Sequence, residues 1–390
     1  MHSKEYSVVV GGKTITAMFT DLAEQANGSV ILKSEGTVVL ATACISSDGK
    51  DNRGFFNLTV EYMEKFYAAG LILGGQYNKR EGRPSDEAIL SARVIDRTIR
   101  PLFAHHIKNA VQVIVTVLAV GESDPGVLGV NAASLALAVS DIPWAGPVGA
   151  VHVGNAKGAT DALAIDAYIP NNGENNYELD LTVCGKNGEV VMIEAMAHEY
   201  DETKMNAALD AAMPAIATLV AWQKDIIKEI GKPKMDMPAP AIPEEVTSAF
   251  NDSVGKNLDT IFGTDGKKAF HTLESQWRDV IAEKFPTVAG EKHAHADIAT
   301  DLLESKLDER IHVAALKEGK RADGRAFDQV RGLYAKAGGF SDVLHGTGIF
   351  YRGETHVLSV LTLGGPEDAT AIEGMEIRGT KRFTHHYYFP

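Results

Sequence analysis

A glycine-rich loop in the first quarter of the chain carries side chains that suit a polyanion. Tyr77 lies in this loop, and Lys79, Arg80 and Arg83 follow it closely. Lysine and arginine neutralise phosphate charge and an aromatic ring can stack on an unpaired base, so this combination is common at sites for single-stranded nucleic acid. The loop therefore predicts a nucleic-acid contact.

Three further arginines follow in a segment with helical spacing. Arg93, Arg97 and Arg100 are spaced i, i+4 and i+7, and would share one face of a helix. Such a face suits the same polyanion, but the arginines could instead pair with acidic residues of the helix, such as Asp86 and Asp96. Ion pairs within the helix account for Arg93, Arg97 and Arg100 better than for the basic residues of the loop. We therefore interpret the three helix arginines as either contacting nucleic acid or stabilising the structure, and favour the structural role.

Other familiar chemistry is missing from the sequence. The loop lacks the Gly-Lys-Ser/Thr ending of a phosphate-binding loop, and no Gly-x-Gly-x-x-Gly follows an expected strand, so ATP and NAD sites are unsupported. Cys44 and Cys184 are the only cysteines, too few for a disulfide framework or a cysteine metal cluster. We therefore assign no metal or cofactor site to the chain and expect a reducing compartment, the cytoplasm.

The overall charge limits how much of the surface can bind a polyanion. Lys and Arg number 38 against 52 Asp and Glu, a formal net charge of −14, which argues against a protein coated all over with nucleic acid or anionic lipid. The 390 residues, 45% of them hydrophobic, suit roughly two or three globular domains. No signal-peptide pattern and no long apolar run occurs, so we expect neither secretion nor membrane spanning.

Hydrophobic periodicity predicts the elements that position these side chains. Runs of β-branched residues in the first third alternate with polar residues and predict a half-buried antiparallel sheet. The spacing then becomes helical, with Ser85 as the N-cap and Pro101 as the stop. Downstream we expect strands at 111–120, 149–153, 178–184 and 189–194, the last two joined by an Asn-Gly hairpin, and helices at 125–140 and 202–230.

A change of composition marks a boundary after the last of these helices. Residues 231–243 hold four of the chain's fourteen prolines and are interpreted as a linker. Residues 244–310 have a helical pattern. Because residues 201–310 carry 13 basic and 20 acidic side chains, the helical part is a poor candidate for the main polyanion contact.

The end of the chain resembles its beginning when the two are aligned at a shift of 318 residues, which indicates an internal repeat. After a nine-residue insertion, the alternating residues 56–62 correspond to 383–389, which predicts a strand there. Identical pairs at this shift include Gly28 and Gly346, Thr37 and Thr355, Val39 and Val357, and Leu40 and Leu358.

Motifs in both copies carry a family resemblance. In the first copy they are 67–70 (YAAG), 80–85 (REGRPS), 95–103 (IDRTIRPLF) and 140–150 (SDIPWAGPVGA), and in the second they are 323–325 (DGR), 345–346 (HG) and 352–355 (RGET). Together, and in this order, they resemble polynucleotide phosphorylase (polyribonucleotide nucleotidyltransferase). That family is built from two ribonuclease PH-like repeats joined by an all-helical domain.

The resemblance implies an α+β fold made of ribonuclease PH-like (ribosomal S5 domain 2-like) repeats. The chain would be the amino-terminal part of the enzyme, without the KH and OB-fold modules expected at its far end. The implied boundaries are 1–230 for the first repeat, 231–243 for the linker, 244–312 for the all-helical domain and 313–390 for the incomplete start of the second repeat.

The resemblance also implies an activity, the processive 3′-to-5′ degradation of RNA to nucleoside diphosphates in mRNA turnover. Inorganic phosphate is the co-substrate and a divalent metal, Mg²⁺, assists. The family assigns catalysis to second-repeat motifs that would follow Pro390. The matching position of the first repeat reads Asp180-Leu181-Thr182, with threonine in place of lysine. We therefore expect no catalytic residue in this chain and no activity of the chain alone.

In this family the first repeat guides RNA, which assigns Tyr77, Lys79, Arg80 and Arg83 to single-stranded RNA. Many relatives read Gly-Gly-Phe-Phe-Arg-Arg at the loop; the loop here is longer and has one aromatic, which favours phosphate contact over stacking. A homotrimer, partner proteins of RNA degradation and a cytoplasmic location are implied in the same way. The alternative is a noncatalytic RNA-binding or assembly module, favoured by an open reading frame that stops after Pro390.

The second copy leads to an expectation about stability. A strand at 383–389 would have an apolar face and unpaired backbone groups, because the elements that follow its first-copy counterpart are missing. We therefore expect residues 323–390 to be loosely ordered or to drive oligomerisation, and residues 1–212 to fold stably.

Overall fold

The chain forms two compact units, each with a hydrophobic core of its own. Unit 1 comprises Met1–Pro238 together with Asp368–Pro390, and unit 2 comprises Ala239–Glu367. The computed structural model describes residues 3–47, 56–72, 81–156, 163–165, 177–239, 241–263, 265–286 and 295–389.

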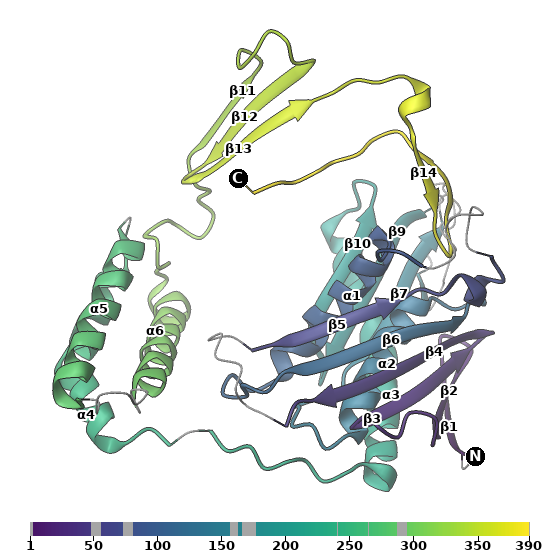
Figure 1. Cartoon of the computed structure of the whole chain (residues 1–390), viewed down its shortest axis with the longest axis horizontal. Helices are drawn as coiled ribbons and strands as arrows, with labels where there is room; N and C mark the ends of the chain where they lie inside the picture. Colours follow the sequence, from purple (N-terminus) through teal and green to yellow (C-terminus); the bar gives the residue numbers. More distant parts are fainter. Residues whose placement is uncertain are drawn as a thin grey trace. The chain divides into compact units, whose positions relative to one another are not determined.

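The larger sheet of unit 1 has six strands in the order β1-β2-β3-β4-β6-β5, visible side by side in Figure 1. All neighbours are antiparallel except β5 and β6, so the predicted antiparallel sheet is largely confirmed. In β4 and β6 every second residue is buried, as expected for a sheet with one face on a core. The strands are β1 (Ser3–Val10), β2 (Lys13–Thr20), β3 (Gly28–Ser34), β4 (Thr37–Ile45), β5 (Leu58–Met63) and β6 (Val111–Ala119).

Helix α2 (Pro125–Val139) covers the core face of this sheet. Nearly all of its residues are buried, and it packs on β3, β4 and β7. Gly28 permits the close approach, because a Cβ atom there would lie 2.1 Å from the carbonyl oxygen of Ala136. Helix α1 (Asp86–Ile99) begins as predicted, with the Ser85 side chain accepting a hydrogen bond from Ala88 N, and a short 3₁₀ turn η2 (Arg100–Leu102) carries the chain through Pro101.

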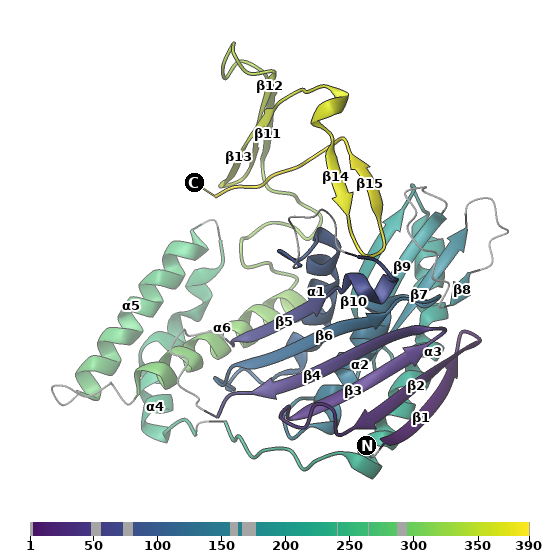
Figure 2. The same cartoon turned by 45° about the vertical axis from the view of Figure 1, so that its right-hand side comes forward.

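A second sheet of unit 1 has the order β10-β9-β7-β8 (Figure 2). Its strands are β7 (Gly149–Ala156), β8 (Ala164–Ile165), β9 (Tyr177–Lys186) and β10 (Glu189–Ala197). Asn187 and Gly188 both have positive φ (53° and 85°), which matches the predicted two-residue hairpin turn.

Helix α3 (Glu202–Ile230) lies on β7 and β9. By length and composition it is the one helix of the described residues that could cross a membrane. Its buried residues, among them Ala212, Ile216 and Leu219, belong to the hydrophobic core of unit 1. The apolar character of α3 is thus explained by packing within the unit.

The predicted linker is irregular in structure, but its first part is tied to unit 1. Lys232 N and Met235 N donate to the carbonyl oxygens of Val139 and Asp141. The ammonium of Lys234 donates to three carbonyl oxygens where α2 ends, at 2.7 to 3.0 Å. Burial lowers the pKa of Lys234 to about 8, against the opposite influence of the Asp141 carboxylate. Residues 231–235 therefore act as a cap on α2 more than as a spacer.

Unit 2 begins with helices, as the pattern predicts. Phe250 and Trp277 meet edge to face with centroids 5.3 Å apart, and Trp277 Nε1 donates to the carbonyl oxygen of Ala299 at 2.8 Å. These contacts join three helices into one core. The helical elements are α4 (Glu244–Asp252), η3 (Val254–Ile261), α5 (Gly266–Lys284) and α6 (Ala296–Glu318).

The remainder of unit 2 contains a three-stranded sheet, β11 (Leu333–Ala337), β12 (Gly346–Arg352) and β13 (Thr355–Leu361). Its pairing register equals that of β2, β3 and β4 at the shift of 318 residues. Leu32 pairs with Val39 in the first copy, and Phe350 pairs with Val357 in the second. The repeat found in the sequence is therefore a repeat of structure.

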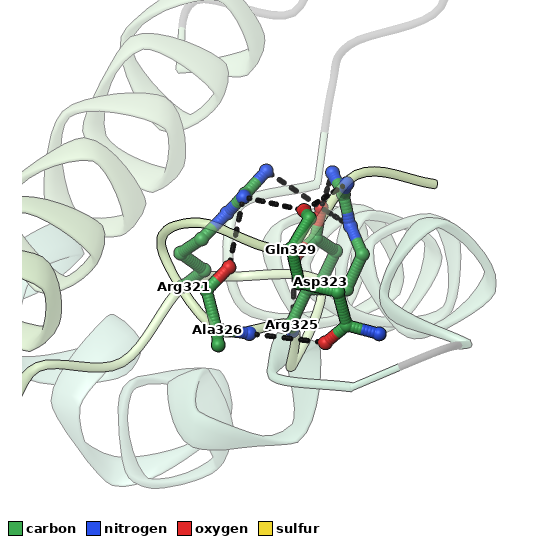
Figure 3. A network of polar contacts seen from close by, with 5 residues as sticks. All are labelled: Arg321, Asp323, Arg325, Ala326 and Gln329. Atoms are coloured by element: carbon green, nitrogen blue, oxygen red, sulfur yellow. Dashed lines mark hydrogen bonds and ion pairs between the residues drawn. The ribbon is translucent and has the colours of Figure 1, made fainter. Parts of the chain in front are cut away.

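A polar loop takes the place of the strand that corresponds to β1 (Figure 3). Asp323 accepts hydrogen bonds from the side chains of Arg321 and Arg325 and from Arg325 N. Both guanidinium groups also donate to the carbonyl oxygen of Gln329. The carboxylate, with a pKa lowered chiefly by Arg325, thus organises the loop that leads to β11.

The predicted strand at 383–389 is wrong. These residues are irregular and their aromatic side chains are exposed. The physical reason lies in the first copy, where β5 is held by parallel pairing with β6, and no such neighbour pairs with 383–389 in the described part of the chain. Upstream, β14 (Thr370–Glu373) and β15 (Arg378–Lys381), drawn in Figure 2, form a hairpin that the sequence did not indicate.

Candidate functional site

The loop singled out by its composition is described only at its end. Tyr77, Lys79 and Arg80 lie outside the described residues. Arg83 is exposed just before α1, and within the described chain it takes part in no ion pair.

The residues around Arg83 are held in place from both sides. Glu81 forms an ion pair with Lys65 and accepts a hydrogen bond from Phe66 N, at the start of η1 (Phe66–Ala69). Ser85 donates to Glu64 at 2.6 Å while it caps α1. Burial raises the pKa of Glu64, and the hydrogen bond from Ser85 opposes that rise. The end of the loop is thus fixed to the strand-to-helix corner that follows β5.

The helix arginines separate into two kinds. Arg100 forms two hydrogen bonds with Asp96 and donates to the carbonyl oxygens of Phe56 and Leu58, so it ties the end of α1 to the start of β5. The Asp96 carboxylate raises the pKa of Arg100. Arg93 and Arg97 are exposed and make no ion pair with any described residue. Only Arg100 therefore takes the structural ion pair that the sequence suggested for all three.

A buried histidine and a partly exposed aspartate meet beside the start of α2, at the position that the resemblance compares with a catalytic motif. His152 Nε2 and Asp180 Oδ1 are 2.5 Å apart. Asp124, which is half-buried, accepts hydrogen bonds from Gly126 N and Val127 N as the N-cap of α2. Burial raises the pKa of Asp124, and His152 lowers it in part.

This arrangement leaves little room for an anion at the start of α2. The helix N-terminus is where a phosphate would use free backbone N–H groups, but Asp124 already accepts from two of them and Pro125 has none. Thr182 pairs with His152 on β7 and with Glu194 on β10, so no cation stands next to Asp180 on β9. Among the described residues, this group therefore presents no evident site for a negatively charged reactant.

Potential metal ligands do not cluster in the described part of the chain, and one of its two thiols is unreactive. No group of three or more His, Cys, Asp or Glu side chains there could hold a metal ion. Cys44 and Cys184 are free thiols, and burial raises the pKa of Cys184 to about 12, which makes it unreactive.

Sequence reasoning noted Asp180 but missed its two partners. Asp124 had a usable signal, because an aspartate directly before a proline and a run of helix formers is a typical N-cap. His152 had none, since it reaches Asp180 only through the pairing of β7 with β9.

Comparisons with known proteins agree with the resemblance. Residues 13–143 match the family model of the 3′ exoribonuclease family, domain 1, called RNase_PH. The polyribonucleotide nucleotidyltransferase of Syntrophomonas wolfei is 36% identical over 389 residues, which cover 99% of this chain and 54% of that protein. The enzyme of the same name from Thermotoga maritima is 39% identical over 393 residues, with the same two shares.

A solved structure, rice (Oryza sativa) Rrp46, aligns with a TM-score of 0.44 and 15% identity, covering 55% of this chain and 94% of that one. This chain spans about half the length of the curated relatives that it matches. The resemblance is confirmed: the chain is similar along nearly all of its length to about half of a polyribonucleotide nucleotidyltransferase, and residues 13–143 match a 3′ exoribonuclease domain.

Proposed function

We propose that this chain is the amino-terminal part of a polyribonucleotide nucleotidyltransferase that degrades RNA from the 3′ end with inorganic phosphate and releases nucleoside diphosphates. The observation that carries the proposal is the 34–39% identity to enzymes of that name over nearly all of this chain. The alternative is a noncatalytic RNA-binding or assembly module, and a stop codon directly after Pro390 in the gene favours it.

The first repeat guides RNA in this proposal and does no chemistry. At the position that corresponds to the family's catalytic Asp-x-Lys motif, the first repeat has Asp180 beside His152, and Thr182 stands where the lysine that would attract phosphate is expected. Asp124 further places a carboxylate where an attacking phosphate would need positive potential.

Phosphorolysis by the purified chain tests this division of labour. Incubated with 3′-labelled RNA, phosphate and magnesium, the chain should release no nucleoside diphosphates, whereas a protein of the relatives' full length should release them. Robust release by the chain alone would mean that Asp180 and its neighbours form a working site. Failure of the full-length protein to use phosphate would favour the noncatalytic module.

RNA guidance is assigned to Tyr77, Lys79, Arg80 and Arg83, with Arg93 and Arg97 as additional exposed cations. Each lost phosphate contact should lower the slope of log affinity against log salt by about 0.7 for single strands. The variant Lys79→Ala, Arg80→Ala, Arg83→Ala should therefore lower the slope by about 2.

A control with the same number of lost cations separates this effect from net charge. Lys267, Lys268 and Arg278 lie on α5 and are exposed. Their triple alanine variant should keep the slope within about 0.5 of the original. Equal slopes for the loop variant and the unmodified chain, with the fold intact by circular dichroism, would overturn the assignment.

The remaining parts of the proposal concern architecture and assembly. We assign 1–230 to the first ribonuclease PH-like repeat, 231–243 to the linker, 244–312 to the all-helical domain and 313–390 to the start of a second repeat. The shared register of β2–β4 and β11–β13 supports the second repeat. We further propose that the protein forms a homotrimer, has RNA-degradation partners, lies in the cytoplasm and is assisted by Mg²⁺ held outside this chain. Sedimentation of the full-length protein tests the trimer.

A further inference from the structure

Three aromatic rings form a row across the second-copy sheet. Tyr334 on β11 pairs with Tyr351 on β12, which pairs with His356 on β13. The Tyr351 and His356 rings are stacked with centroids 3.9 Å apart, and the Tyr334 and Tyr351 centroids are 5.4 Å apart. Tyr334 is 50% exposed and Tyr351 38%, so ring surface remains open to solvent.

The register of the repeat shows which face of the sheet carries this row. In the first copy the residues of the core face, such as Leu32 and Val39, correspond to Phe350 and Val357. The aromatic row falls on the opposite face. Its first-copy equivalents are Thr16, Lys33 and Val38, which are only half-buried. Exposure of the row is therefore the ordinary state of this face and not the consequence of a missing helix.

The row is specific to the second copy. None of the three equivalent first-copy residues is aromatic, although both sheets share the same backbone pairing. A strand face can be solvated with threonine and lysine, as the first copy shows. Three rings in line therefore indicate a surface suited to a flat, apolar ligand.

A cation lies beside the row, in a part of an acidic chain that holds few carboxylates. Lys336 follows Tyr334 by two residues on the same strand and so points to the same face. Arg352 alternates with Tyr351 along β12 and therefore lies on the opposite face with Phe350, at the edge of the sheet where the Arg331 side chain approaches Gly353. These three cations form no ion pair with any described residue. Residues 329–363 hold only Asp342 and Glu354 as acidic side chains.

We propose that the aromatic row of Tyr334, Tyr351 and His356 is a stacking platform for the bases of single-stranded RNA, with Lys336 facing its phosphates. A sheet face with solvent-exposed aromatics is a known solution for binding unpaired bases, because every base has a face that can stack. Duplex RNA hides those faces, so the platform selects single strands. The inference rests on the proposed function, in which RNA is the substrate of the parent protein.

The test is equilibrium binding of a fluorescent single-stranded oligonucleotide to the whole chain without phosphate, so that no turnover intervenes. The variant Tyr334→Leu, Tyr351→Leu should bind at least about fivefold more weakly per lost ring. The variant Tyr334→Phe, Tyr351→Phe keeps both rings and should bind within about twofold of the unmodified chain. Phe350→Leu is the matched control, since Phe350 is an equally exposed aromatic on the same strand and the other face.

A positional readout removes ambiguity about folding. Ultraviolet crosslinking followed by peptide mapping should place a base on a peptide that contains Tyr334 or Tyr351. Unchanged affinity of the leucine variant, an equal loss in Phe350→Leu, or crosslinks confined to other segments would overturn the proposal and leave the row as a surface for a protein. Failure of the proposed function is seen separately, as full-length protein that releases no nucleoside diphosphates.

Discussion

The sheets β2–β4 and β11–β13 have the same pairing register but opposite surroundings. Leu32 and Val39 are fully buried in the first, while their equivalents Phe350 and Val357 are 42% and 36% exposed in the second. The difference is helix α2, which packs on β3 and β4. Strand pairing is therefore specified by the local sequence, whereas burial depends on an element that lies some ninety residues further along the chain.

The turns of the two copies support the same conclusion. In the turn between β3 and β4, Glu35 and Gly36 have φ of 43° and 81°. In the equivalent turn between β12 and β13, only Gly353 has a positive φ. Each two-residue turn nevertheless sets the same register. Glycine occupies one turn position in both copies, which is enough to close the hairpin.

The largest contrast is expected for the central core side chain. Leu32→Ala should destabilise unit 1 by about 2–5 kcal/mol, because it removes a fully buried side chain and leaves a cavity. Phe350→Ala should change stability by less than about 1 kcal/mol. Hydrogen exchange in a urea series, read from peptides of β3–β4 and β12–β13, measures both. A comparable loss in both copies would show that the second sheet has a core of its own.

A second contrast concerns the glycines at the start of β3 and β12. Gly28→Ala should cost about 3 kcal/mol, since its Cβ would meet a backbone oxygen of α2 that cannot move alone. At Gly346 the nearest atoms, 3.3 Å away, belong to the half-exposed side chain of Leu361, so alanine should be tolerated. Thermal denaturation of the two variants decides the matter. Destabilisation by Gly346→Ala alone would contradict the comparison.

A third contrast uses a buried hydroxyl. Thr37 donates to the carbonyl oxygen of Ser123 and accepts from Gly121 N and Ser123 N. Thr37→Val leaves those groups without a partner and should cost about 1–3 kcal/mol. Thr355 is exposed, so water can replace its hydroxyl contacts and Thr355→Val should be neutral. Urea midpoints read from peptides of β3–β4 for Thr37→Val and of β12–β13 for Thr355→Val measure the difference, and an unchanged midpoint for Thr37→Val would show that water replaces the lost bonds.

Local signals in the sequence predicted much of this fold. The Ser85 cap, the Asn187-Gly188 hairpin and the full length of α3 each depend on neighbouring residues, and the structure has all three. Pairing between distant segments was harder. β14 and β15 have weak strand character, and 383–389 has strand character without a partner strand.

The same distinction applies to the candidate site. The basic loop and the helix arginines could be grouped as one candidate site from the sequence, because these side chains are close along the chain. Asp124, His152 and Asp180 come from three segments and meet only through the sheet that joins β7 to β9. The aromatic row has the same origin, since Tyr334, Tyr351 and His356 become neighbours only by strand pairing.

The smallest effect is expected where the copies differ at their starts. Residues 321–328 of the second copy correspond to β1 of the first, but a loop organised by Asp323 replaces the strand. The pKa of Asp323 is lower in the fold than in the unfolded chain, so its contribution is present above the usual aspartate range near 4 and is lost as the pH falls through the lowered value. Hydrogen exchange of the Arg325 backbone amide, corrected for the intrinsic rate, should therefore accelerate below about pH 4. The variant Asp323→Asn should show this faster amide exchange already at pH 7. Amides of β1 paired with β2 serve as the internal control, because backbone pairing holds them. Equal acceleration in β1 would indicate general acid unfolding and not the release of this loop.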